Sequence, residues 1–331
     1  MIISRTPFRI SFAGGGTDLP SYYLKEDGQV ISTTIDKYLY VAVKRQTAIA
    51  EHKFRINWSK VEFKDHIEDI EHPIVREALK MMNIDFPLEI STFADIPAKT
   101  GLGSSSAFAV GLLHALHALK GEMVTKGNLA AQAAELEIEI LGRKIGKQDH
   151  YSASFGNINV FSFLKTGHVS IEPVFYRAET KTAVENHLML FYTAIKRDAN
   201  EILKVQSESS SNNHKILNQM KNQVRVVREM ISSGKNLHEF GKILDQGWRL
   251  KKSLVDAISS DEIDESYEKA INAGAIGGKL LGAGGGGFLL FFVEPQNQQD
   301  VRNTLSNLYE LPFSFDTGGG TRITYYDQER I

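Results

Sequence analysis

The sequence predicts a protein of the α/β class with two domains, each a two-layer α+β arrangement of helices against a sheet. Its 331 residues exceed one ordinary domain and allow a large core to be buried. Strand and helix patterns alternate through the first half of the chain, and long helical patterns dominate the second half. Because this character changes near residue 185, we expect one domain at 1–185 and another at 186–331.

Apolar periodicity places the elements of the first domain. Alternating or continuous apolar residues predict strands at 2–12, 38–45, 53–58, 88–94, 157–163 and 168–175. Apolar residues at helical spacing predict helices at 73–83, 104–119 and 126–142.

The second domain begins with a strand predicted at 187–193. Helices are predicted at 199–208, 213–232, 236–258, 262–273 and 296–308, with a polar loop at 207–213. Further strands are predicted at 275–281, 287–293 and 321–327.

The composition excludes several functional classes. A formal net charge of −2 argues against a general nucleic-acid or anionic-membrane surface. The absence of cysteine excludes disulfides, thiolate metal sites and a cysteine nucleophile. The longest apolar run, 288–293, is far shorter than a membrane span, and the first residues lack a signal-peptide pattern. We expect a cytoplasmic protein that binds neither nucleic acid nor membrane.

A loop rich in glycine and serine joins the strand at 88–94 to the helix at 104–119. Glycines let the backbone approach a ligand, and a helix start offers unpaired N–H groups and a positive dipole end. One serine would suffice as a cap, whereas three stand here in succession. The loop predicts a phosphate site, not of the Walker type because G-x-x-x-x-G-K-[ST] is absent. Its residues are Gly101, Leu102, Gly103, Ser104, Ser105, Ser106 and Ala107.

Two other glycine clusters follow strand patterns. The first contains Gly14, Gly15, Gly16, Thr17 and Asp18, and Asp18 alone is typical of a turn or helix cap. The second spans residues 282–287 and satisfies G-x-G-x-x-G, but a strand follows it, so a dinucleotide site is not predicted. These glycines form either a strained hairpin or a flat backbone surface against a ligand or against the phosphate loop. Residues 318–320 are expected to form a plain hairpin turn.

With these motifs in order, the chain resembles the GHMP kinases, such as galactokinase, homoserine kinase and mevalonate kinase. Pro7-x-Arg9 with its glycines is similar to their first motif, the loop from Pro97 to Ala107 to the second, and residues 279–288 to the third. The resemblance implies the GHMP kinase fold, with a ferredoxin-like C-terminal domain and the active site between the domains. The residues of the first motif are most similar to those of the D-glycero-D-manno-heptose 7-phosphate kinase branch.

A fourth segment resembles the part of galactokinase-like members that carries a glutamate, a glycine and an aspartate. Glu137, Gly142 and Asp149 reproduce that spacing. Glu135 and Glu139 are close competitors of Glu137, since i, i+4 acids on a helix also form a solvated stripe. The family usually has glutamine where this chain has His150.

The resemblance implies a kinase that uses ATP and Mg²⁺. The loop from Gly101 to Ala107 would bind the ATP phosphates, and Ser105 and Glu137 would coordinate Mg²⁺, which prefers oxygen ligands. Asp149 would act as the base and Arg9 would offset the migrating charge, although a structural ion pair is the alternative for these two. Sugar binding is expected at Asp18, Gly15, Gly16, Thr17 and Gly285.

The expected partner is a small sugar or sugar phosphate, with the anomeric C1 hydroxyl of D-glycero-D-manno-heptose 7-phosphate as the acceptor. Trp58 either flanks the adenine or packs in the core. An L-fucose or galactose kinase and a non-catalytic sensor are the alternatives, and both a monomer and a homodimer remain open. Candidates for a substrate phosphate are Arg143, Lys144, Lys147, Lys251 and Lys252.

Overall fold

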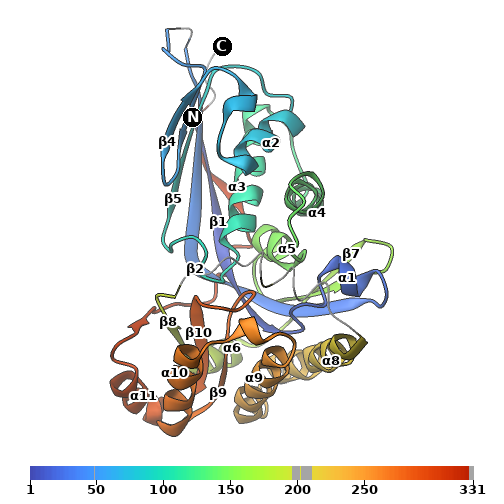
Figure 1. Ribbon diagram of the computed structural model, residues 1–331, viewed down its shortest axis with the longest axis vertical. Coiled ribbons are helices and arrows are strands. Elements are labelled where there is room, and N and C mark those ends of the chain that lie inside the picture. Colours follow the sequence, from blue (N-terminus) through green and yellow to red (C-terminus); the bar gives the residue numbers. More distant parts are fainter. Residues whose placement is uncertain (48, 196–201, 203–210, 328–331) are drawn as a thin grey trace.

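Two sheets, each packed against helices, build the molecule (Figure 1). The computed structural model describes residues 1–331 except 48, 196–201, 203–210 and 328–331. The helix expected at 199–208, apart from Ile202, and most of the polar loop at 207–213 lie outside the described residues. Within the described part of the chain, no helix combines the length and apolar character needed to cross a membrane.

The larger sheet contains eight strands, six of them in the order β12-β1-β2-β5-β3-β4, while β6 pairs with β2 and with β7. Its central strand, β2, is long enough to pair with β6 through its first residues and with β5 through its last. Only the second half of β2 was predicted, because Ser32, Thr33 and Thr34 interrupt the apolar pattern of the first half. The strands are β1 (Ile2–Ala13), β2 (Gly28–Arg45), β3 (Phe54–Asn57), β4 (Val61–Lys64), β5 (Leu88–Ala94), β6 (Asn159–Phe163), β7 (Val169–Pro173) and β12 (Arg322–Tyr326).

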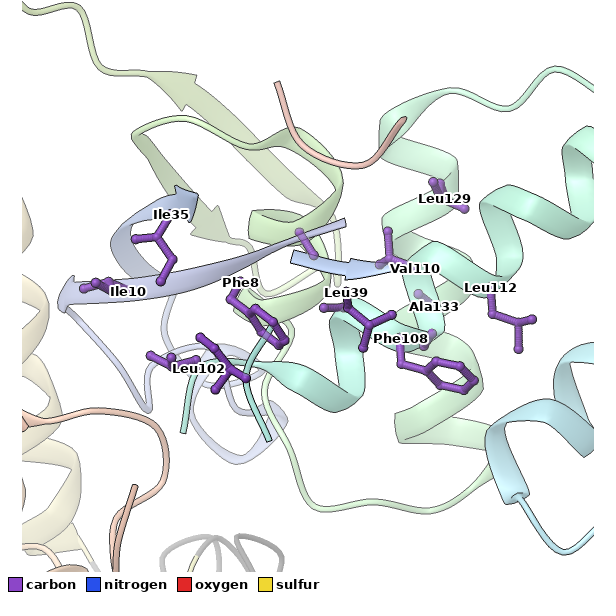
Figure 2. Packing of buried hydrophobic residues seen from close by; sticks show 14 of the residues in the cluster. Phe8, Ile10, Ile35, Leu39, Leu102, Phe108, Val110, Leu112, Leu129 and Ala133 are labelled. Carbon is purple, nitrogen blue, oxygen red and sulfur yellow. The ribbon is translucent and has the colours of Figure 1, made fainter. Parts of the chain in front are cut away.

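Helices cover one side of the larger sheet (Figure 1). The central one, α3, is apolar on all sides and buried along most of its length. Figure 2 shows Phe8, Leu39 and Leu102 packing beside residues of α3 such as Phe108. Full burial of a side chain such as Phe8 stabilises the fold by about 1.5–3 kcal/mol. The helices are α2 (Pro73–Met81), α3 (Ser104–Leu119), α4 (Lys126–Ala134), α5 (Gln148–Phe155) and the π-helix η2 (Glu135–Ile140).

The smaller sheet is antiparallel, with the order β11-β8-β10-β9. This order along a β-α-β-β-α-β path is that of a ferredoxin-like unit. Its central strand β10 is buried at every residue. The strands are β8 (Leu188–Tyr192), β9 (Ala275–Leu280), β10 (Phe288–Val293) and β11 (Tyr309–Glu310), and the helices are α8 (Ser211–Ser233), α9 (Leu237–Lys252), α10 (Asp261–Asn272) and α11 (Gln298–Thr304).

The last strand returns to the larger sheet. β12 pairs with β1 in antiparallel register, Ile2 opposite Tyr326, although it lies in the stretch expected to form the second domain. The expected boundary near residue 185 falls in the last turn of α6 (Ala178–His187), directly before β8.

The prediction of a plain hairpin at 318–320 is wrong, because the flanking strands β11 and β12 belong to different sheets. The segment instead crosses the end of α5, where a Cβ on Gly320 would lie 2.2 Å from the Ser154 carbonyl oxygen.

Candidate active site

The predicted phosphate loop leads into α3 through glycines in left-handed conformations. Gly101 has φ 83° and Gly103, the N-cap of α3, has φ 78°. No side chain caps the helix. Its first N–H groups and its positive dipole end are therefore presented at the loop, as an anion site requires.

Not every residue of the loop presents a group to a ligand. Ser105 is exposed, whereas Ser106 is buried. Leu102 inserts its side chain into the core beside Phe8 (Figure 2). The Ala107 N–H already donates to the Gly103 carbonyl oxygen at 2.9 Å. Leu102 and Ala107 therefore shape the loop, and their own contact with ATP remains a prediction.

The third glycine cluster packs against this loop. A Cβ on Gly101 would lie 2.6 Å from the Leu281 carbonyl oxygen, and one on Gly282 would lie 2.5 Å from the Gly101 Cα. A Cβ on Gly287 would lie 2.3 Å from the Thr100 carbonyl oxygen. Both sequence interpretations hold, because residues 282–287 form the hairpin between the antiparallel strands β9 and β10 and also lie flat against the phosphate loop. The smaller sheet thus supports the phosphate site through close backbone contacts.

Arg9 and Asp149 meet beside the loop. The Arg9 Nε donates to Asp149 Oδ1 at 2.6 Å and its Nη2 donates to Oδ2 at 2.8 Å. Its Nη1 donates to the Gly101 carbonyl oxygen at 2.6 Å. Asp149 lies in the first turn of α5, where a helix favours negative charge. Arg9 is 4% exposed and the Asp149 side chain 22%, so the carboxylate remains reachable from outside.

Glu137 is the buried acid among the three candidates. Glu135 and Glu139 are exposed on η2, whereas Glu137 is fully buried. Its carboxylate contacts the Ser105 hydroxyl and the Arg143 guanidinium through Oε1. Its Oε2 contacts His150 Nε2 at 2.9 Å. The pairing of Ser105 with Glu137 agrees with the predicted metal ligands.

Neighbouring positive charge and hydrogen bonds keep Glu137 ionised. Burial opposes its ionisation and is the largest single effect. Hydrogen bonds and positive charge from His150 and Arg143, with the Ser105 hydroxyl, outweigh burial and lower the pKa of Glu137 to about 2. The group is a carboxylate at neutral pH.

The donor set fits a magnesium ion. A hydroxyl and a carboxylate oxygen are ligands that Mg²⁺ accepts, and in the structure a guanidinium cation bridges these same two groups. Among the described residues, no group of three His, Asp or Glu side chains is placed to hold a metal by itself. Phosphate oxygens and water would have to complete the coordination, as is usual for Mg²⁺.

The first glycine cluster is tied to α5 through Asp18. Its carboxylate accepts the Gly16 N–H at 3.0 Å and the Gln148 N–H at 3.1 Å, which is the turn-and-cap arrangement. Burial, and next the charge of Asp149, raise the pKa of Asp18. Thr17 is buried and its hydroxyl donates to the Gly14 and Gln29 carbonyl oxygens at 2.7 and 2.8 Å. Both side chains hold the loop in place, and their contact with a sugar remains a prediction.

Gly15 and Gly285 differ in their surroundings. A Cβ on Gly15 would meet no atom nearer than 3.9 Å. Gly285 donates its N–H to the Ile258 carbonyl oxygen at 2.8 Å, so this amide is already engaged.

Two buried lysines lie near Arg9. The Lys279 Nζ donates to the Phe12 carbonyl oxygen at 3.2 Å, and the Lys251 Nζ donates to the Gly282 carbonyl oxygen at 2.5 Å. Burial, and then the charge of Arg9, lower the pKa of Lys279 to about 7. Burial, followed by the charges of Lys279 and Arg9, lowers the pKa of Lys251 well below its usual range.

Sequence reasoning found Lys251 but missed Lys279, which occupies a position in an otherwise apolar strand pattern. A lysine within an apolar strand pattern was the signal that could have identified this residue. The other cationic candidates differ. Lys144 is exposed, Lys147 donates to the Gly167 carbonyl oxygen at 3.0 Å, and Lys252 pairs with Asp264 at 2.9 Å.

An aromatic group borders the Glu137 site. Trp58 and His72 meet edge to face at 4.7 Å, and His72 lies 4.9 Å from the ring of Phe108 on α3. Burial lowers the pKa of His72 to about 4. The charge of Arg143 also lowers this pKa, whereas the charge of Glu137 raises it. The Trp58 indole N–H donates to Glu62 at 2.8 Å. Trp58 is partly buried beside the core, and its contact with adenine remains a prediction.

Comparisons with known proteins agree with this geometry. The model of the GHMP kinase N-terminal domain matches residues 73–157, and that of the GHMP kinase C-terminal domain matches residues 208–311. The chain is 31% identical over 334 residues to the D-glycero-alpha-D-manno-heptose 7-phosphate kinase of Campylobacter jejuni, covering 96% of this chain and 97% of that one. It is 24% identical to a galactokinase of Pyrococcus furiosus, covering 95% of each chain.

A solved structure shows the same fold. The crystal structure of a D-glycero-D-manno-heptose 1-phosphate kinase from Bacteroides thetaiotaomicron superposes with a TM-score of 0.80 at 24% identity, covering 99% of this chain and 100% of that one. The match to the N-terminal domain model includes the phosphate loop, Glu137 and Asp149. The chain therefore belongs to the GHMP kinase family and is a phosphotransferase.

Proposed function

We propose that the protein is a sugar kinase that transfers the γ-phosphate of ATP to the anomeric C1 hydroxyl of D-glycero-D-manno-heptose 7-phosphate. The product would serve the synthesis of surface-polysaccharide precursors in the cytoplasm, where ATP is available. The 31% identity with the heptose 7-phosphate kinase of Campylobacter jejuni supports the choice of acceptor.

One observation carries the proposal. The Arg9 fork holds the Asp149 carboxylate at the backbone of the phosphate loop, with Arg9 Nη1 2.6 Å from the Gly101 carbonyl oxygen. Phosphoryl transfer requires mainly positioning and charge compensation. A base, a fixed cation and free helix amides are brought together here from three separate segments of the chain.

We assign the roles as follows. The Ser104–Ser106 end of α3 binds the ATP phosphates, and Asp149 accepts the proton of the attacking sugar hydroxyl. Arg9 keeps Asp149 in place and offsets the charge that moves toward the leaving oxygen. Ser105 and Glu137 would hold Mg²⁺, which supplies charge neutralisation to the triphosphate.

The charge near the acceptor suits a phosphorylated sugar. Lys279 and Lys251 are both buried, and both donate hydrogen bonds to backbone carbonyl oxygens. Burial disfavours the charged forms of both lysines, and an anionic substrate group beside them would favour their protonation. This supports an acceptor that already carries a phosphate.

A coupled assay of ADP release tests the proposal. We expect turnover with D-glycero-D-manno-heptose 7-phosphate and little or none with free heptose, L-fucose or galactose, and ³¹P NMR should show an anomeric phosphate. The Asp149→Asn protein serves as the control for background ATP hydrolysis.

Each other outcome has a definite meaning. Turnover with L-fucose or galactose alone would reassign the acceptor and leave the kinase mechanism standing. ATP binding without ADP release for every sugar would contradict the kinase proposal and indicate a sensor.

A further inference from the structure

The Arg143 guanidinium contacts both of the groups assigned to magnesium, which also contact each other. Its Nη1 lies 2.6 Å from the Ser105 hydroxyl oxygen and also contacts Glu137 Oε1. Glu137 Oε2 is held separately by His150 at 2.9 Å. Arg143 therefore covers the one carboxylate oxygen that faces Ser105.

A metal ion and this guanidinium compete for the same lone pairs. A magnesium ion approaches its ligand oxygens to about 2.0–2.1 Å, which leaves no room for an N–H donor in the same direction. Moving Glu137 instead would leave a fully buried carboxylate without its partners, at a large cost. Displacement of Arg143 is the smaller change.

The surroundings of Arg143 allow its side chain to leave. It follows Gly142, outside any helix or strand, and its side chain is 23% exposed. Its backbone is anchored by its N–H, which donates to the Glu137 carbonyl oxygen at 3.0 Å. Only the side chain has to move, and it remains close to the site after it has moved.

We propose that Arg143 is a placeholder cation that closes the metal site in the nucleotide-free enzyme and is displaced from Glu137 when the divalent cation binds. This inference rests on the proposed metal role of Ser105 and Glu137. It explains how a buried carboxylate stays charged before the metal arrives. The released guanidinium also stays beside the incoming phosphates, where positive charge is useful.

Manganese binding to the protein with a non-hydrolysable ATP analogue, whose phosphate oxygens complete the coordination, tests this inference without any sugar. Mn²⁺ is a paramagnetic substitute for Mg²⁺, and free and bound ions are distinguished by electron paramagnetic resonance. The apparent affinity is reduced to the fraction of sites that a competitor leaves open, and a site closed about nine times in ten binds about tenfold more weakly. Arg143→Gln should therefore bind Mn²⁺ about tenfold more tightly than the wild type. Lys144→Gln, which changes the exposed neighbouring cation, should bind Mn²⁺ like the wild type.

Arg143→Lys provides a second variant if the glutamine protein does not fold. Lysine keeps the charge but lacks the planar fork, so it should give a smaller gain in Mn²⁺ affinity. A merely structural Arg143 would leave Mn²⁺ affinity unchanged or reduce it, and either result in a folded variant overturns the inference. Because no sugar or turnover is involved, such a failure is distinct from a failure of the proposed kinase activity.

Discussion

Asp149 is held in one orientation by two hydrogen bonds from a single guanidinium. The fork from Arg9 uses one lone pair on each carboxylate oxygen and leaves the others free. A bidentate pair fixes both the position and the plane of the carboxylate. At the scale of the residue, the site thus has a carboxylate that is fixed in position and in plane.

Replacing Asp149 by asparagine should abolish proton acceptance and keep the shape of the side chain. We expect kcat to fall by about 10²–10⁴-fold, the usual contribution of a general base. The dissociation constant for ATP should change little, because the loop and α3 remain intact. Steady-state kinetics and nucleotide titration measure these quantities.

Asp85→Asn is the matched control, since this carboxylate is 80% exposed and pairs with Lys53 on the surface. It should behave as the wild type. Ordinary turnover in Asp149→Asn would leave the Arg9–Asp149 contact as a structural ion pair only.

The sequence could not choose between neighbouring acids at this scale. Glu135, Glu137 and Glu139 are equivalent in residue type and differ by burial, which depends on how η2 packs. The cap function of Asp18 was among the alternatives because a short acid beside glycines is typical of turns. Arg143 at the metal ligands was missed, since side-chain direction in an irregular segment has no periodic signal.

The phosphate loop shows how one element is shaped by its neighbours. Gly103 has φ 78°, and a Cβ there would lie 3.2 Å from Asp149 Oδ2 and 3.3 Å from the Arg9 Cγ. The loop thus needs glycine at this position both for its backbone conformation and for contact with the Arg9–Asp149 pair.

Gly103→Ala should reduce kcat/KM for ATP by about tenfold or more, because small displacements of reacting groups are costly. Its free energy of unfolding should also fall by about 1–2 kcal/mol from the left-handed conformation alone. Kinetics and urea unfolding measure the two effects.

Gly121→Ala separates strain from displacement. Gly121 has φ 71°, and a Cβ there would meet nothing within 4 Å. This variant should lose similar stability and keep its activity. Equal loss of activity in both variants would contradict the role of the Gly103 contact.

Elements with strong apolar periodicity were predicted well, and those dominated by tertiary contacts were not. The pattern of α3 is apolar over most of its sixteen residues and needs no partner to be recognised. The helix α5, which carries Asp149, was missed because its serines and histidine are buried against other elements. The π-helical widening at η2 left no signal in a run that also fits an α-helix.

The two sheets are joined by a buried lysine. Lys279 lies on β9 of the smaller sheet and donates to the Phe12 carbonyl oxygen on β1 of the larger one. The charge of Arg9 acts on Lys279, and the charges of Lys279 and Arg9 act on Lys251. Since its pKa is about 7 in the folded protein and about 10.4 in an unfolded chain, the two states differ in bound protons between these values.

Between pH 7 and about 10 the unfolded chain holds a proton at Lys279 that the folded protein lacks. The free energy of unfolding should therefore rise with pH in this window, by up to about 1.4 kcal/mol per pH unit for this group. Lys279→Met should remove that contribution from the measured slope.

Lys235→Met, at an exposed lysine, should leave the slope as in the wild type. Urea unfolding of the three proteins at a series of pH values provides the comparison. An identical slope in Lys279→Met and the wild type would show that Lys279 is protonated throughout.

The arrangement of the whole molecule was foreseen through family resemblance more than through local pattern. Composition and periodicity give two α/β units, but they do not say which strands pair. The assignment of β12 to the larger sheet depends on contacts across more than three hundred residues, as between Ile2 and Tyr326. Local sequence carries no information about such a pairing.

The return of β12 to the larger sheet has a mechanical consequence. The chain leaves that sheet after β7 and re-enters it at β12, so the smaller unit is attached by two crossings instead of one. A unit attached by two chain connections can rotate about the line that joins them, but it cannot move away independently. The two crossings therefore limit how far the smaller unit can move from the larger sheet, and with it the turn at 282–287 that packs against the phosphate loop.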